Sequence, residues 1–212
     1  MKSELQLRRR DLALLEALAL RVRLIGQRQA ADAFWHGHCA NARRRLGQLA
    51  SNGMLTRNLV NAQPLPEIIE PVVRWQPGQV APDAGHVAYQ VQHRWKFRAL
   101  RPTVVYFPTV KTISQFGGSE RSQTKLTQIT HDLGVTAIWL RYASQNNNTT
   151  AMWIGEDILA PTRIREKLPD AALVDQQGQP KLLIEFAGSY GPERIADFHD
   201  DAAARGLPYH LW

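Results

Sequence analysis

Three prolines fall within eleven residues of this chain, in the run from Asn61 to Pro71. Proline has no backbone N–H and a fixed φ, so such a run is excluded from a helix interior and from a central strand. A chain of 212 residues, 44% of them hydrophobic, can bury one sizeable core or two smaller ones. We therefore expect two domains, at 1–62 and 72–212, joined by a linker at 63–71.

The positive charge of the chain is confined to its first part. Residues 1–60 contain 11 Lys and Arg against 4 Asp and Glu, whereas residues 61–212 contain 15 of each, so the formal charge of +7 belongs to the first segment. Contacts from Lys and Arg to phosphate are the main sequence-independent contribution to nucleic-acid affinity. The charge distribution therefore indicates a basic module that meets a polyanion, and double-stranded DNA is the first partner to expect.

Cysteine content and hydropathy limit the cellular setting. The single cysteine, Cys39, excludes an internal disulfide and a multi-cysteine zinc site. The first residues lack the apolar stretch of a signal peptide, and no window approaches the roughly 18 apolar residues of a membrane span. We expect a soluble, cytoplasmic protein.

The basic segment carries the pattern of three short helices followed by a strand. Apolar residues recur at helical spacing after Asp11, again from Gln27 to Trp35, and a third time from His38 to Ser51. Asn52-Gly53 supplies the left-handed residue that ends a helix. The alternation from Met54 to Val60 is typical of a strand, which would form a wing beside the third helix.

The third expected helix separates an apolar stripe from a polar face at i, i+3, i+4 and i+7. Asn, Arg and Gln side chains make paired hydrogen bonds to base edges in the major groove, where an exposed helix fits. From about Arg8 to Val60 the chain thus resembles a winged helix-turn-helix. The residues expected to contact DNA are Asn41, Arg43, Arg44, Arg45, Gln48, Arg57 and Arg28.

Two structural alternatives accompany this interpretation. The run Arg43-Arg44-Arg45 could be a solvated helix face, which is the usual role of a charge run. The run Arg8-Arg9-Arg10 could be an arm that touches phosphate or only a solubilising end.

The remaining part of the chain predicts a mixed sheet with flanking helices, and hence an α/β (α+β) fold. Expected helices begin near Pro82-Asp83, Ser122 and Pro192. The expected strands are Val72–Trp75, Thr103–Phe107, Val135–Tyr142, Ala151–Ile154, Ala171–Val174, Lys181–Phe186 and Leu207–Trp212. A hairpin joins the strands before and after the turn at residues 175–180.

Two carboxylates of that hairpin are candidate catalytic groups. Asp170 stands at the entrance of one strand and Glu185 lies among apolar residues in the next. A carboxylate in such a strand costs several kcal/mol unless it is paired or binds a cation. Together they could hold Mg²⁺ for phosphodiester hydrolysis, with Glu156 as a third ligand and His131 as a base.

Each of these residues also has a structural interpretation. Asp170 could be a turn residue after proline, and Glu156 an exposed loop acid. His131 could be a cation at a helix C-terminus. Glu185 could pair with an arginine, for which Arg163, Arg165 and Arg194 are the candidates.

The order Pro169-Asp170, hairpin, Glu185-Phe186-Ala187, helix and strand resembles the PD-(D/E)XK nuclease fold, which is similar to restriction endonucleases. With the winged helix, Thr130-His131-Asp132-Leu133 and Trp153, the chain resembles the replication-relaxation family of plasmids and conjugative elements. The resemblance implies DNA binding in plasmid replication, transfer or their transcriptional control, with a body that dimerises or adds DNA contact.

The sequence departs from the nuclease pattern two residues after the glutamate. Ala187 stands where that fold has a lysine that stabilises transition-state charge. We therefore expect a sequence-specific DNA-binding protein whose nuclease-like domain has lost hydrolytic activity. The alternatives are a Mg²⁺-dependent endonuclease that uses Asp170 and Glu185, and a scaffold that binds an acidic protein through the basic face.

Overall fold

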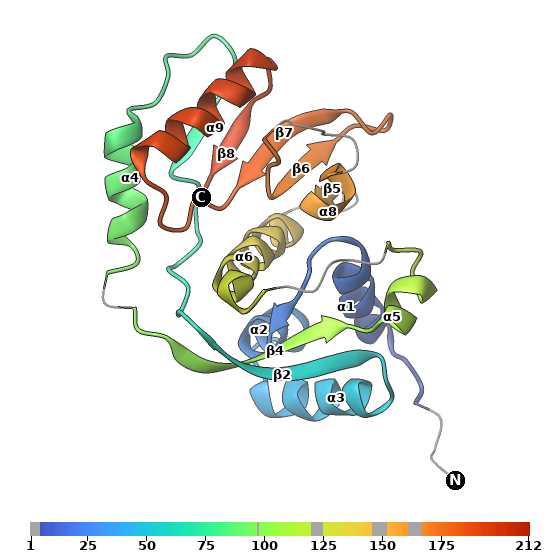
Figure 1. The fold of residues 1–212 in the computed structure, drawn as a ribbon. Coiled ribbons are helices and arrows are strands. Elements are labelled where there is room, and N and C mark those ends of the chain that lie inside the picture. Colours follow the sequence, from blue (N-terminus) through green and yellow to red (C-terminus); the bar gives the residue numbers. More distant parts are fainter. Residues whose placement is uncertain (1–4, 97, 120–124, 146–151, 161–166) are drawn as a thin grey trace. The chain divides into compact units, whose positions relative to one another are not determined.

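The computed structural model describes residues 5–96, 98–119, 125–145, 152–160 and 167–212, and it divides the chain into two compact units (Figure 1). Unit 1 comprises Met1–Gln63 and Leu100–Thr136, and unit 2 comprises Pro64–Ala99 and Ala137–Trp212. Both units are thus discontinuous in sequence. This differs from the expected division at residues 63–71, because segment 100–136 belongs with the N-terminal residues.

Unit 1 begins with helices at the places where the sequence predicts them. Its first elements are α1 (Arg9–Leu20), β1 (Ile25–Gly26), α2 (Gln27–Trp35), α3 (Cys39–Ser51) and β2 (Leu55–Ala62). The buried face of α1 is formed by Leu14, Leu15 and Leu18. His36, with φ 50°, takes the left-handed conformation that ends α2.

A three-stranded antiparallel sheet completes unit 1, with the strand order β1-β4-β2. The central strand β4 (Arg101–Pro108) buries Val105 and Tyr106 completely. A strand, β2, is present after the third helix as the sequence predicts, but its partner is β4, which lies beyond the proline-rich run in sequence. The register pairs Leu55 with Pro108 and Ala62 with Arg101. After β4 come α5 (Val110–Gln115) and a 3-10 turn, Leu126–Gln128.

The prediction of a strand at Val135–Tyr142 is wrong, because these residues belong to the helix α6 (Ile129–Gln145). Its β-branched and aromatic residues suggested a strand. However, Ile129, Leu133, Thr136 and Trp139 are buried at spacings of three and four residues, which is the helical period. The packing of that stripe outweighs the weak strand propensity. The helix expected from Ser122 begins only at Ile129, and residues 120–124 lie outside the described part.

Unit 2 is built on a five-stranded mixed sheet with the order β3-β8-β7-β6-β5. Its strands are β3 (Val73–Trp75), β5 (Trp153–Gly155), β6 (Ala171–Val174), β7 (Pro180–Glu185) and β8 (Tyr209–Leu211). Among the strand pairs that the structure describes in this sheet, only β7–β8 is parallel, and β6 and β7 form the predicted hairpin. The combination of helices with an antiparallel sheet and a mixed sheet confirms the expected α/β (α+β) class.

Two helices pack side by side in unit 2 (Figure 1). They are α4 (Ala84–His93), capped by the Asp83 side chain, and α9 (Pro192–Ala204), which starts with proline as predicted. Val87 and Val91 of α4 join Ile195 and Phe198 of α9 in the apolar core, against Leu183 of the sheet. The short helix α8 (Glu156–Leu159) follows β5.

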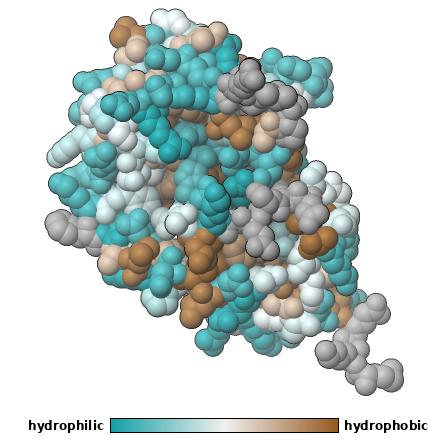
Figure 2. Space-filling view, in the orientation of Figure 1, coloured by the Kyte–Doolittle hydropathy of each residue, from teal (hydrophilic) through white to brown (hydrophobic). Residues whose placement is uncertain are grey.

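The surface shown in Figure 2 is mainly hydrophilic, and hydrophobic residues appear there in separate groups. Among the described residues, none of the helices has the length and apolar character needed to cross a membrane.

Candidate nucleic-acid interface

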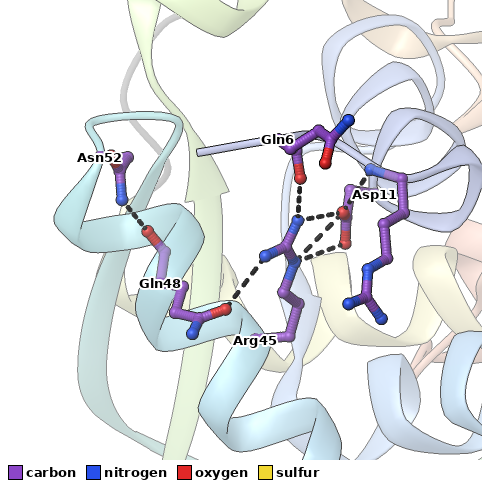
Figure 3. Close-up of polar contacts among 6 residues, drawn as sticks. Gln6, Asp11, Arg45, Gln48 and Asn52 are labelled. Carbon is purple, nitrogen blue, oxygen red and sulfur yellow. Dashed lines mark hydrogen bonds and ion pairs between the residues drawn. The ribbon is translucent and has the colours of Figure 1, made fainter. Parts of the chain in front are cut away.

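A fully buried carboxylate lies at the base of the polar face of α3. Asp11, in the first turn of α1, is 0% exposed and accepts a hydrogen bond of 2.8 Å from the backbone N–H of Arg8. Both of its oxygens accept from the Arg45 guanidinium, with the shortest distance, 2.6 Å, between Nη2 and Oδ2 (Figure 3). The N-terminus of α1 is thereby tied to the middle of α3.

The ion pair sets the protonation of both partners. Burial alone would raise the pKa of Asp11, but hydrogen bonds from Arg45 and the Arg8 N–H, with the positive charges of Arg45 and Arg10, hold that pKa below its usual value. The hydrogen bond to Asp11 also raises the pKa of Arg45. Asp11 is therefore ionised and Arg45 protonated at neutral pH.

Arg45 differs from the open DNA contact that the sequence predicts. Its side chain is only 16% exposed, and its Nη2 also donates to the Gln6 carbonyl at 2.7 Å. Its Nη1 donates to Oε1 of Gln48 at 3.0 Å, which fixes that amide (Figure 3). Because this guanidinium already donates to Asp11, Gln6 and Gln48, it is not available for a base contact.

The remaining residues predicted on α3 are exposed. They are Asn41, Arg43, Arg44 and Gln48. Arg57 is exposed on β2, where its register partner is Tyr106. Arg28 is exposed on α2 but lies 3.1 Å from the Asp32 carboxylate, so part of its charge is neutralised locally.

A hollow of about 300 Å³ lies where α3 meets the start of α1. Its lining residues are Arg8, Arg10, Asp11, Trp35, Asn41, Arg44, Arg45 and Gln48. Arg10 is held in place by a 3.2 Å hydrogen bond to the Phe34 carbonyl and by the Trp35 ring, whose centroid is 5.1 Å from Cζ. Four guanidinium groups and one carboxylate give the hollow a formal charge of +3.

Sequence analysis missed Asp11, Trp35 and the hollow itself. In the sequence, Asp11 only precedes the first expected helix, and Arg8 and Arg10 belong to a run that could be an arm touching phosphate or a solubilising end. The aspartate directly after three arginines could have suggested a local ion pair. Its actual partner, however, lies 34 residues away on another helix.

A second polar cluster lies in unit 2, where Asp170 and Glu185 come together as predicted. They flank the paired ends of β6 and β7, next to the Ala171–Ile184 register pair. Their hydrogen bonds cross: the Asp170 N–H donates to Glu185 Oε2 at 3.1 Å, and the Phe186 N–H donates to Asp170 Oδ2 at 2.7 Å. The carboxylates thus accept hydrogen bonds from the backbone of the hairpin itself.

Tyr190 is a member of this cluster that sequence analysis did not single out. Its hydroxyl donates to Glu185 Oε1 at 2.7 Å. Burial, the charges of Glu185 and Asp170, and this hydrogen bond all raise the pKa of Tyr190, although Arg194 opposes them. The phenol therefore stays neutral and serves as a donor to the buried glutamate, which is 5% exposed.

Three cations of unit 2 that could replace the missing lysine, Lys167, Lys181 and Arg194, have other partners. Lys181 pairs with Asp175 at 3.0 Å, and Lys167 pairs with Asp197. Arg194 stacks over the Tyr190 ring, with Cζ 3.8 Å from its centroid, so it reaches Glu185 only through that tyrosine. Arg163 and Arg165 lie outside the described residues.

The two remaining candidates have different positions. Glu156 starts α8, and its N–H donates to the Asp170 carbonyl at 2.9 Å, so its backbone adjoins the carboxylate cluster. His131 lies in the first turn of α6 in unit 1, so it is not a cation at a helix C-terminus. Within the described ranges, no group of three or more His, Cys, Asp or Glu side chains is arranged to hold a metal ion.

Comparison with known proteins adds no relative: no family model, curated protein or solved structure matches this chain.

Proposed function

We propose that this protein binds double-stranded DNA through unit 1, in the manner of a winged helix-turn-helix. The observation that carries the proposal is the positively charged hollow beside the exposed face of α3, which includes Asn41, Arg44 and Gln48. The order α1, β1, α2, α3, β2, β4 with a three-stranded antiparallel sheet agrees with such a domain. Here the connection between the two long strands includes residues of unit 2.

The charge of each unit supports the same proposal. Unit 1 contains 15 Lys and Arg against 6 Asp and Glu, whereas unit 2 contains 11 against 13. The formal charges are therefore +9 and −2, a sharper separation than the linear sequence indicates. A polyanion is attracted to unit 1 in particular.

Binding to duplex DNA tests this proposal. We expect an affinity for a 20-base-pair duplex that falls steeply between 50 and 200 mM salt, because bound phosphates release counterions. Arg44→Ala weakens it, whereas Lys96→Ala, which removes an exposed charge from unit 2, leaves it nearly unchanged. Electrophoretic mobility that stays unchanged at micromolar protein would contradict DNA binding and favour a scaffold for an acidic protein.

We further propose that the carboxylate cluster of unit 2 does not hydrolyse DNA. Ala187 is completely buried in the apolar core, so no cation replaces the lysine at that position. The carboxylates accept hydrogen bonds from Asp170 N–H, Phe186 N–H and Tyr190. Loss of a transition-state cation carries a large rate penalty.

A Mg²⁺-dependent endonuclease is the second candidate, and the convergence of Asp170 with Glu185 favours it. Incubation of the protein with supercoiled plasmid and Mg²⁺ or Mn²⁺ separates the two. We expect no cutting. Metal-dependent cutting that disappears in Asp170→Ala would establish the endonuclease.

The resemblance to the replication-relaxation family extends the proposal to a biological role. We propose that the protein acts in the replication, transfer or transcriptional control of a mobile genetic element, with unit 2 contributing dimerisation or additional DNA contact. Mapping of protected sequences on plasmid DNA tests this role, because a replication or transfer origin, or a promoter, should be protected.

A further inference from the structure

We infer that the hollow between the start of α1 and α3 binds a single phosphate group, and that this group belongs to the DNA backbone. The inference rests on the proposed DNA binding and assigns the hollow to a backbone phosphate instead of a base edge. Base edges are read by side chains that protrude into a groove. The residues of this hollow instead line a concave space, to which the start of α1 contributes Arg8 and Arg10 and α3 contributes Asn41 and Arg44.

Several donors of the hollow are fixed before any ligand arrives. The Arg45 guanidinium donates hydrogen bonds to the Asp11 carboxylate, the Gln6 carbonyl and the Gln48 side-chain amide oxygen, which fixes its position (Figure 3). The Phe34 carbonyl and the Trp35 ring hold Arg10. A site whose side chains are already ordered loses less conformational entropy on binding.

Other donors remain available to a ligand. The side chains of Arg8, Asn41 and Arg44 line the hollow and are exposed, so a ligand can reach them. Guanidinium groups match the oxygens of a phosphate in bidentate geometry. Since the formal charge of the hollow is +3 with Asp11 included, an anion offsets the mutual repulsion of the arginines.

The volume of the hollow fits a small anion. At about 300 Å³ it is at the lower limit of ligand pockets, which suits one phosphodiester and its bound water better than a nucleotide base with its sugar.

The three consecutive arginines Arg8, Arg9 and Arg10 provide a matched control. Arg8 and Arg10 line the hollow, whereas Arg9, which is exposed, does not. Arg8→Ala and Arg44→Ala should each reduce the slope of log affinity against log salt by about 1. Arg9→Ala should leave the slope nearly unchanged. Urea unfolding of each variant verifies that the fold is intact, which the exposure of Arg8 and Arg44 favours.

Two duplexes of unrelated sequence distinguish phosphate from base contact. If Arg44 contacts phosphate, Arg44→Ala weakens binding to both duplexes by the same factor. Weakening confined to one duplex would overturn the phosphate assignment while leaving DNA binding intact. An effect of Arg9→Ala as large as that of Arg8→Ala would also overturn it.

Binding of small anions tests the phosphate site separately from the proposed DNA binding. Pyrophosphate, titrated in a calorimeter at low salt, should bind the wild type and be lost in Arg44→Ala. If pyrophosphate binds but duplex DNA does not, both the proposed DNA binding and the assignment of the phosphate to a DNA backbone are wrong. The hollow would then be a phosphate site for a free ligand. If neither binds, both proposals fall. Binding of polyglutamate that depends on Arg8 and exceeds that of pyrophosphate would overturn the phosphate site in favour of an acidic protein.

Discussion

At the scale of single residues, Asp11 decides how the basic face is organised. A charge taken out of water costs several kcal/mol unless it is paired and hydrogen-bonded. Asp11 satisfies both conditions through Arg45 and the Arg8 N–H. The same contacts fix the position of the N-terminal segment on α3. Stability and the arrangement of the proposed phosphate site therefore depend on one carboxylate.

Removal of this carboxylate should destabilise the protein strongly. Asp11→Ala removes the counterion of Arg45, whose side chain is only 16% exposed. We therefore expect the free energy of unfolding, measured by urea denaturation, to fall by about 3 kcal/mol. Because the pKa of Asp11 is lowered by folding, its contribution is present above the unfolded pKa and disappears as pH falls through the folded pKa. The double variant Asp11→Ala, Arg45→Met should lose less than the sum of the single changes. Additive losses would show that the pair is not coupled.

His210 of unit 2 should make stability depend on pH in a different range. Burial, with the charge of Arg74, lowers the pKa of His210 to about 4, and its Nδ1 lies 2.6 Å from the Tyr142 hydroxyl. The unfolded state thus binds a proton near pH 6.5 that the folded state does not, so stability should fall as pH decreases from about 6.5 to about 4. Urea midpoints across this range should show a flatter dependence for His210→Gln. An equal slope in wild type and variant would contradict the assignment.

At the scale of elements, local patterns predicted helices and short strands well and failed where distant packing decides. The bounds of α2 and the proline start of α9 agree with the sequence pattern, because caps and turn residues act locally. The helix α6 was missed because its β-branched residues mask a helical stripe. The pairing of β2 with β4 depends on contacts across the proline-rich run, which no local pattern reports.

The candidate sites show the same division. The convergence of Asp170 and Glu185 was predictable, because a hairpin places residues at its two strand ends opposite each other. The ion pair of Asp11 with Arg45 was not, because it joins two helices separated by a turn and a third helix. Tyr190 escaped notice because a loop tyrosine has no distinctive spacing.

Two glycines of unit 1 should respond to alanine in opposite directions. Gly47 lies inside α3 with nothing within 4 Å of an added Cβ, so Gly47→Ala should stabilise the protein by about 0.5–1 kcal/mol through helix propensity. A Cβ on Gly118 would lie 2.5 Å from the Ala19 carbonyl oxygen, so Gly118→Ala should cost about 1–3 kcal/mol. Thermal unfolding of both variants measures the contrast. Stabilisation by Gly118→Ala would show that α1 and the residues after α5 are not packed as described.

At the scale of the whole molecule, the two units are interleaved in sequence. Residues 64–99 of unit 2 interrupt unit 1 between β2 and β4, two strands that pair over their whole length. Unit 1 therefore requires both of its segments to complete a sheet and a core.

Fragments should reveal this requirement. Residues 1–63 alone lack the central strand β4 with its buried Val105 and Tyr106, so we expect no cooperative unfolding transition by circular dichroism. Replacement of residues 64–99 by an Asn-Gly turn, with the fragment ending at residue 136, should restore the transition, because Ala62 and Arg101 are register partners. A cooperative transition in residues 1–63 alone would contradict the assignment of β4 to unit 1.

The β3–β8 pair has a consequence for synthesis on the ribosome. Trp75 leaves the ribosome before Tyr209, the residue on whose ring it stacks, with centroids 5.5 Å apart, because the two positions are far apart in sequence. The nascent polypeptide can finish unit 1 once residue 136 has left the exit tunnel. Until β8 has also been made, β3 and α4 lack the sheet against which they pack, and they form an apolar segment that chaperones can recognise.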